Sequence, residues 1–129
     1  MLIGGNTTRI YLSAGGTDMR KGFEGLYALV KDKLALDPLS GHLFVFCNRG
    51  CNRIKVLHWD GSGLWICAKR LEKGRFAWPK LKAEELARGV VQLSPPQWTM
   101  LIEGIDLRDT QQRKWYRLEE GEKSAQYKE

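Results

Sequence analysis

The sequence lacks long apolar runs and has few cysteines. No stretch approaches the roughly 18–20 apolar residues that a membrane span requires. The first sixteen residues lack a charged segment followed by an apolar core, so we expect no secretory signal. Cysteine occurs three times, an odd number. With no signal expected, the sequence predicts reduced thiols, no membrane association and a cytoplasmic location.

Motifs for catalysis are also missing. There is no G-x-S-x-G element, and Gly15-Gly16 is not followed by Gly-Lys-Ser/Thr, so neither a serine nucleophile nor a phosphate loop is expected. The central acids have local explanations: helix capping for Asp18, a turn before proline for Asp37 and a hairpin turn for Asp60. Glu72 lies in a charged turn. We therefore expect no catalytic residues and no cofactor, and a metal-dependent nuclease is the least favoured class.

A zinc site is a second possibility that the sequence supports only weakly. Its candidate ligands are Cys47 and Cys51, spaced C-x3-C, with His58 and Cys67 further along. Paired C-x2-C knuckles are absent, and small buried hydrophobic residues explain Cys47 and Cys67 equally well. We expect no metal here.

Positive charge is what the sequence does have, and it is concentrated. The net charge of the chain is +6 and its sequence pI is about 9.4. Residues 42–82 hold nine Lys or Arg against two acids, a net +7, whereas residues 1–41 carry +1 and residues 83–129 carry −2. The same stretch is rich in Trp and Phe. A basic, aromatic β segment favours a nucleic-acid partner over a small molecule.

The residue patterns predict an α+β fold in one domain over 1–107, followed by a polar, partly disordered tail at 108–129. A short strand at 9–12 precedes a helix at 18–34, capped by Thr17 or Asp18. Short Gly-containing turns then separate strands at 42–47, 53–59, 64–71 and 75–78. A last strand at 90–93 leads into a helix at 95–104, which begins at Ser94-Pro95.

We therefore expect an antiparallel sheet of about four to five strands, packed by one N-terminal and one C-terminal helix. The strands between His42 and Trp78 should form a meander. Five side chains should point toward the helix at 18–34: Phe44, Phe46, Ile54, Val56 and Ile66. The tryptophans Trp59, Trp65 and Trp78 should be buried, because aromatic residues dominate cores.

The candidate DNA-binding residues come from the basic strands. Arg53 and Lys55 share a strand face, and Lys69 to Arg75 surround the turn after the next strand. Cationic side chains in such a cluster contact phosphates. We predict one contiguous positive face made of Arg53, Lys55, Lys69, Arg70, Lys73 and Arg75.

At these residues the chain resembles a known family, the TnpB accessory proteins of the insertion-sequence-sixty-six transposons. The resemblance covers about residues 9–107. It starts at Thr17-Asp18-Met19-Arg20-Lys21-Gly22-Phe23 and continues through Ser40-Gly41-His42-Leu43-Phe44-Val45-Phe46. It closes with Lys69-Arg70-Leu71-Glu72-x-Gly74-Arg75-Phe76-x-Trp78-Pro79, Leu93-Ser94-Pro95 and Glu103-Gly104-Ile105-Asp106.

The resemblance implies a small protein encoded beside a separate transposase, which performs the chemistry. We accordingly expect a non-catalytic accessory protein for transposition whose partners are the transposase of the same element, DNA, or both. The alternative is a protein–protein adaptor without DNA affinity, whose basic face meets an acidic surface of the transposase. The oligomeric state is left open at this point.

Overall fold

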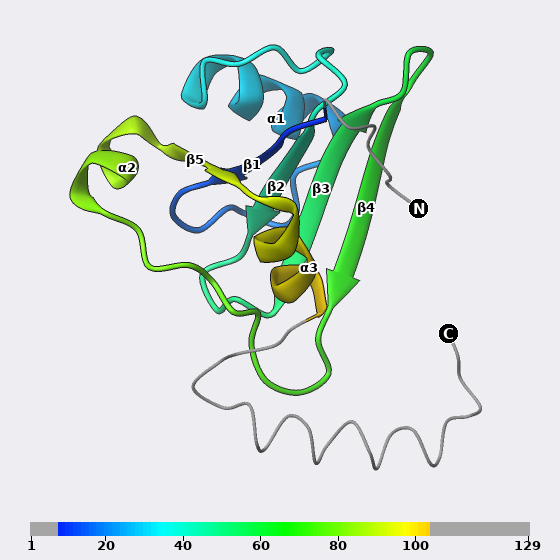
Figure 1. Ribbon diagram of the computed structural model, residues 1–129. Coiled ribbons are helices and arrows are strands. Elements are labelled where there is room, and N and C mark those ends of the chain that lie inside the picture. Colours follow the sequence, from blue (N-terminus) through cyan, green and yellow to red (C-terminus); the bar gives the residue numbers. More distant parts are fainter. Residues whose placement is uncertain (1–7, 104–129) are drawn as a thin grey trace.

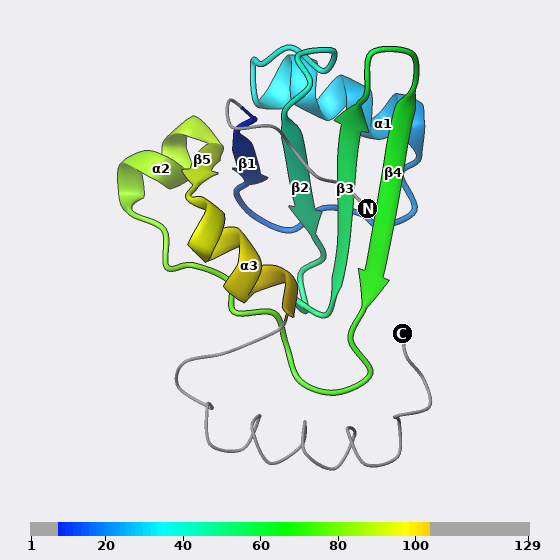
Figure 2. The same ribbon diagram turned by 45° about the vertical axis from the view of Figure 1, so that its right-hand side comes forward.

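A computed structural model describes residues 8–103, which fold as an α+β domain with one five-stranded sheet (Figures 1 and 2). The strand order is β4-β3-β2-β1-β5. In chain order the elements are β1 (Ile10–Ser13), α1 (Phe23–Ala28), the π-helix η1 (Leu29–Lys33), β2 (Leu43–Cys47), β3 (Arg53–Trp59), β4 (Leu64–Arg70), α2 (Ala83–Arg88), β5 (Val90–Leu93) and α3 (Pro95–Glu103).

The sheet is mixed, so the expectation of a purely antiparallel sheet is wrong. Strands β2, β3 and β4 form the expected antiparallel meander, and β5 pairs antiparallel with β1. Strand β1, however, runs parallel to β2, with Ile10 opposite Leu43. Parallel neighbours need a long crossover connection. The segment between these two strands, which contains α1 and η1, provides it.

Helices cover both faces of the sheet (Figures 1 and 2). The α1 face is the one on which Phe44, Phe46 and Leu57 pack with Leu26 and Val30 of the α1–η1 segment. The α3 face is the opposite one, where Leu12, Val45, Ile54 and Val56 pack with Leu101 of α3. Each core contains fully buried side chains.

Two side chains were expected on the wrong face. Phe44, Phe46 and Ile66 pack on the α1 face as expected, but Ile54 and Val56 belong to the α3 core. The register explains this, since Phe44 lies opposite Leu57 and Val45 lies opposite Val56. Opposed residues share a face. In β3, therefore, Leu57 and not its neighbours meets α1.

Helix α1 begins five residues later than expected and lacks the expected side-chain cap. Asp18 does not cap the helix, because its carboxylate accepts hydrogen bonds from the backbone N–H and the guanidinium of Arg20. Thr17 is buried, and its N–H donates to Cys47 O at 2.8 Å. The N-cap is Gly22, whose carbonyl accepts the first helical bond from Leu26.

Helix α3 begins as the sequence predicts. Ser94 Oγ accepts from the N–H of Gln97, and Gln97 Oε1 accepts from the N–H of Ser94, a reciprocal capping box. The expected strand at 75–78 does not form. Phe76 N–H donates to Cys51 O and Trp78 N–H donates to Phe76 O, so this segment turns locally while Phe76 is buried. The tail predicted at 108–129 lies outside the described residues.

Candidate nucleic-acid interface

The basic end of the β3–β4 hairpin is the strongest candidate for a functional surface. Arg53 begins β3 and Arg70 ends β4, and the register places them directly opposite each other. Leu71 N–H donates to Asn52 O at 2.9 Å, which makes Asn52 and Leu71 a hydrogen-bonded pair. Because such pairs alternate along the ladder, Arg53 and Arg70 form a closely spaced, non-hydrogen-bonded pair. Like charges in that position destabilise a sheet.

The charges of this pair are only partly compensated. Arg70 Nε forms an exposed ion pair with Glu72 at 3.2 Å. Arg53 is exposed, and its guanidinium has no hydrogen bond or ion pair with any residue of the 8–103 range. Among the described residues, Glu72 therefore compensates Arg70 but not Arg53. Arginine forks are well suited to phosphate oxygens.

Lys55 extends the cluster on the same face. It lies opposite Ala68, two residues along β3 from the arginine pair. Its ammonium donates to the backbone carbonyl of Lys21 at 2.8 Å, which fixes the half-buried side chain against the loop before α1. An ammonium group has three donors, so this bond leaves capacity for an anion.

Lys69 is separated from these residues, so the prediction that all six cations share one face is wrong for it. Successive residues of a strand point to opposite faces, and Lys69 lies opposite Ile54, whose side chain is in the α3 core. Lys69 Nζ donates to Ile102 O of α3 at 2.6 Å. Lys73 and Arg75 are exposed in the segment that follows β4. Whether any of the six binds DNA stays a prediction.

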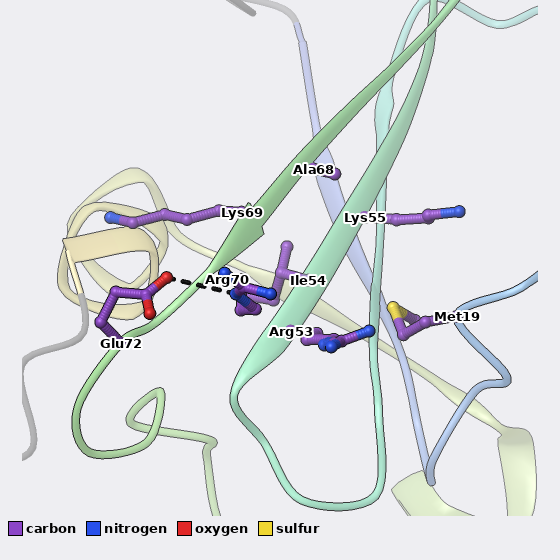
Figure 3. Close-up of a pocket in the computed structure, with 8 residues that line it drawn as sticks. All are labelled: Met19, Arg53, Ile54, Lys55, Ala68, Lys69, Arg70 and Glu72. Carbon is purple, nitrogen blue, oxygen red and sulfur yellow. Dashed lines mark hydrogen bonds and ion pairs between the residues drawn. The ribbon is translucent and has the colours of Figure 1, made fainter. Parts of the chain in front are cut away.

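A shallow pocket of about 410 Å³ lies at this end of the hairpin. Figure 3 shows Arg53 and Lys55 extending from β3 toward the side of Met19, whereas Lys69 extends from β4 toward α3. The eight lining residues are Met19, Arg53, Ile54, Lys55, Ala68, Lys69, Arg70 and Glu72. With the Lys69 ammonium directed to α3, three cations, Arg53, Lys55 and Arg70, and one acid, Glu72, remain on this side, so the pocket is suited to an anion.

The loop before α1 contributes to this surface, which the sequence reasoning missed. Met19 lines the pocket, and the Lys21 carbonyl holds Lys55. Gly16 allows the loop to approach the β2–β3 turn, because a Cβ there would lie 3.1 Å from Arg49 Cα. The available signal is the segment Thr17–Phe23, which belongs to the family resemblance and contains both Met19 and Lys21.

The opposite end of the hairpin has a different chemistry. Asp60 Oδ1 accepts from Ser62 N–H and Gly63 N–H, both at 2.9 Å, and Oδ2 accepts from Trp65 Nε1 at 2.7 Å. The hydrogen bond from the Ser62 backbone, followed by that from the Trp65 indole, holds the pKa of the Asp60 carboxyl well below its usual range. Trp65 itself is 54% exposed, contrary to the expectation that it is buried. Trp59 and Trp78 are half-buried.

The cysteines belong to the α3 core. Cys47 is buried there, and Cys51 and Cys67 pack against the same cluster. Burial, with Cys51 beside it, raises the pKa of the Cys47 thiol to about 12. A protonated core thiol is a poor metal ligand. Within residues 8–103, no three His, Cys, Asp or Glu side chains are grouped closely enough to hold a metal ion. None of the helices in that range is long and apolar enough to cross a membrane.

Comparison with known proteins places the chain in a family. The family model described as IS66 Orf2 like protein matches residues 8–112. The uncharacterized protein y4hO of Sinorhizobium fredii (strain NBRC 101917 / NGR234) is 41% identical over 112 residues, which are 87% of this chain and 93% of that protein. The uncharacterized protein y4jC of the same strain is 38% identical over 98 residues, 76% of this chain and 80% of that protein. No solved structure matches significantly.

The family match includes the whole of the described domain, and with it the loop before α1 and the basic end of the hairpin. It supports the expected accessory role in the transposition of an insertion sequence. The chain therefore belongs to the family of IS66 Orf2-like proteins.

Proposed function

We propose that the protein is a non-catalytic accessory factor that binds the phosphate backbone of duplex DNA during transposition. The basic end of the hairpin, defined as Arg53, Lys55 and Arg70, makes the central contacts, and Lys73 and Arg75 extend them. Lys69 is left out because it lies on the α3 face. The partner that performs the chemistry is the transposase of the same element.

The observation that carries this proposal is the opposition of Arg53 and Arg70 in a close, non-hydrogen-bonded pair. A fold gains nothing from two like charges facing each other across a ladder. A bound polyanion offsets the repulsion, because each phosphate can accept from both guanidinium groups. Since phosphate contacts carry no base information, this surface binds duplexes of different sequence about equally.

A salt series on duplex DNA tests the proposal. Three to five phosphate contacts give a slope of roughly −3 to −4.5 when log affinity is plotted against log salt. Replacing Arg53 and Arg70 by Gln should make the slope shallower by about 2 and lower the affinity about 50-fold at 0.1 M salt. The matched control replaces Lys82 and Arg88, exposed cations at α2 beside the opposite sheet edge, by Gln. Equal losses in both variants would refute a local site.

The adaptor function is the alternative, and the exposed indole of Trp65 favours it. Aromatic side chains of this kind are enriched in protein interfaces. A pull-down with the transposase, with and without transposon-end DNA, separates the two functions. The adaptor predicts that Arg53→Gln with Arg70→Gln abolishes transposase capture while the duplex affinity, already negligible at physiological salt, does not change.

A further inference from the structure

Strand β4 forms one edge of the sheet, and its outer side is unpaired among the described residues. It spans seven residues, Leu64–Arg70, and pairs with β3 in an unbroken register. It contains no proline and no bulge, and residues 64–68 carry no charge. Soluble proteins usually protect an edge with such features. The other edge, β5, has only four residues and α2 packs next to it.

The hydrogen-bonding pattern shows which backbone groups the edge offers. At one end of the hairpin Leu71 N–H donates to Asn52 O, and at the other Asp60 N–H donates to Gly63 O. By alternation, Trp65, Cys67 and Lys69 direct their backbone groups to β3. The groups that point outward are those of the alternate residues, Leu64, Ile66, Ala68 and Arg70. Four N–H and four C=O groups are thus ready for a further strand.

We propose that β4 pairs antiparallel with β4 of a second copy of this chain, about a two-fold axis at Cys67, so that two sheets join into one of ten strands. Antiparallel pairing about this residue uses all eight outward groups: Leu64 pairs with Arg70 of the other copy, and Ile66 pairs with Ala68. Cys67 then faces Cys67 in a non-hydrogen-bonded pair.

In this register the side chains of one β4 strand complement those of the other β4 strand, which favours a second copy of this chain as the partner. The strand is apolar at its Leu64 end and basic at its Arg70 end. Pairing about Cys67 keeps the two Arg70 residues six positions apart, roughly 20 Å at strand spacing. It sets Trp65, 54% exposed, opposite Lys69. In the proposed dimer the apolar stem of Lys69, whose ammonium donates to Ile102 O of its own chain at 2.6 Å, packs against the indole of the other copy.

A two-fold axis of this kind is perpendicular to the sheet, so both α1 faces lie on the same side. The basic ends of the two hairpins would then face one DNA molecule together. The dimer nevertheless does not depend on the proposed function, because its strand pairing involves no phosphate contact. An experiment that shows no dimer therefore leaves the DNA-binding proposal untouched, and an experiment that shows no DNA binding leaves the dimer untouched.

Sedimentation of the full chain, with Ala68→Pro as the variant, is the main test. Proline removes the outward N–H of Ala68 and no bond to β3, and edge strands tolerate proline. We expect wild-type protein to sediment as a dimer and Ala68→Pro as a folded monomer by circular dichroism. Trp65→Lys should weaken the dimer at least tenfold through repulsion of Lys69. Leu86→Lys changes a side chain on α2 that is 55% exposed, and it is the matched control. It should not weaken the dimer.

Oxidation with diamide gives an independent readout that does not need a folded variant. Two thiols lose two protons and two electrons to the diamide and form one disulfide, and the geometry predicts a Cys67–Cys67 link between chains. Peptide mapping should find this link, and Cys67→Ser should abolish it. A monomeric wild-type protein would overturn the proposal, as would a dimer that Ala68→Pro leaves unchanged. Loss of transposase capture by Ala68→Pro in a protein that was always monomeric would assign the edge to the transposase instead.

Discussion

The two ends of the β3–β4 hairpin belong to the same pair of strands but are stabilised in opposite ways. At the turn, the Asp60 carboxylate accepts hydrogen bonds from Ser62, Gly63 and Trp65, so every partner it needs is within five residues. At the other end, Arg53 faces Arg70, and Glu72 is the one acid within residues 8–103 that forms an ion pair with either arginine. One end is complete without a ligand. The other keeps a like-charged pair that is only partly compensated among the described residues, and it is the end that we propose binds DNA.

Removing the charge of Glu72, the acid that pairs with Arg70, should sharpen the contrast between the two ends of the hairpin. Glu72→Gln frees Arg70 from its 3.2 Å ion pair and removes a negative charge near the phosphates. At about 6 Å in a water-like medium that charge opposes binding by roughly 0.7 kcal/mol, so we expect the duplex affinity to rise about threefold. Fluorescence anisotropy at low and moderate salt measures it. Asp37→Asn, at an exposed acid in the turn before β2, is the control and should change nothing.

Most elements of the domain, though not their arrangement, follow from the sequence; the exceptions are the expected strand at 75–78, which does not form, and α2, which is not one of the two expected helices. Val90–Leu93 and the start of α3 form as expected, because proline and Ser94 fix that helix end locally. The parallel pairing of β1 with β2 could not be predicted, since it depends on a crossover whose direction no local pattern states. Helices cover both faces of the sheet, so Ile54 and Leu57 are equally apolar and the pattern does not say which one meets α1.

The candidate site shows the same limit. Strand alternation correctly groups Arg53 with Lys55. Whether Lys69 or Arg70 joins them depends on the register across the hairpin, which the structure sets as Arg53 opposite Arg70. The approach of Lys21 to Lys55 joins residues 34 positions apart. Such contacts arise only when the chain has folded, so strand alternation alone could not place Lys69 on the α3 face.

If the basic end is built for a ligand, removing one arginine should stabilise the free protein. Arg53→Thr replaces half of the like-charged pair with a residue of high β-propensity, and we expect the free energy of unfolding to rise by about 0.2–1 kcal/mol. Urea denaturation measures it. The gain should shrink as salt screens the repulsion. Arg70→Thr should gain less, because it also loses the ion pair with Glu72. If Arg53→Thr lost stability at any salt concentration, the Arg53–Arg70 pair would not be a source of repulsion in the free protein.

A substitution at the turn of the hairpin, where Asp60 lies, should lower the stability of the protein instead of raising it, and by a smaller amount. The hydrogen bonds that Asp60 accepts depress its pKa from the ordinary 3.8. A carboxyl with a depressed pKa in the folded state contributes stability above its unfolded pKa, and this contribution is lost as the pH falls through the folded value. Asp60→Asn should therefore lower the melting temperature slightly at pH 7. The difference from wild type should narrow below about pH 4, while duplex affinity does not change.

Asp18, whose pKa is depressed by hydrogen bonds from Arg20, titrates in the same window. It is present in both proteins, so the difference between their pH profiles isolates Asp60. A difference that widens below pH 4 would mean that the hydrogen bonds of this turn do not stabilise the hairpin.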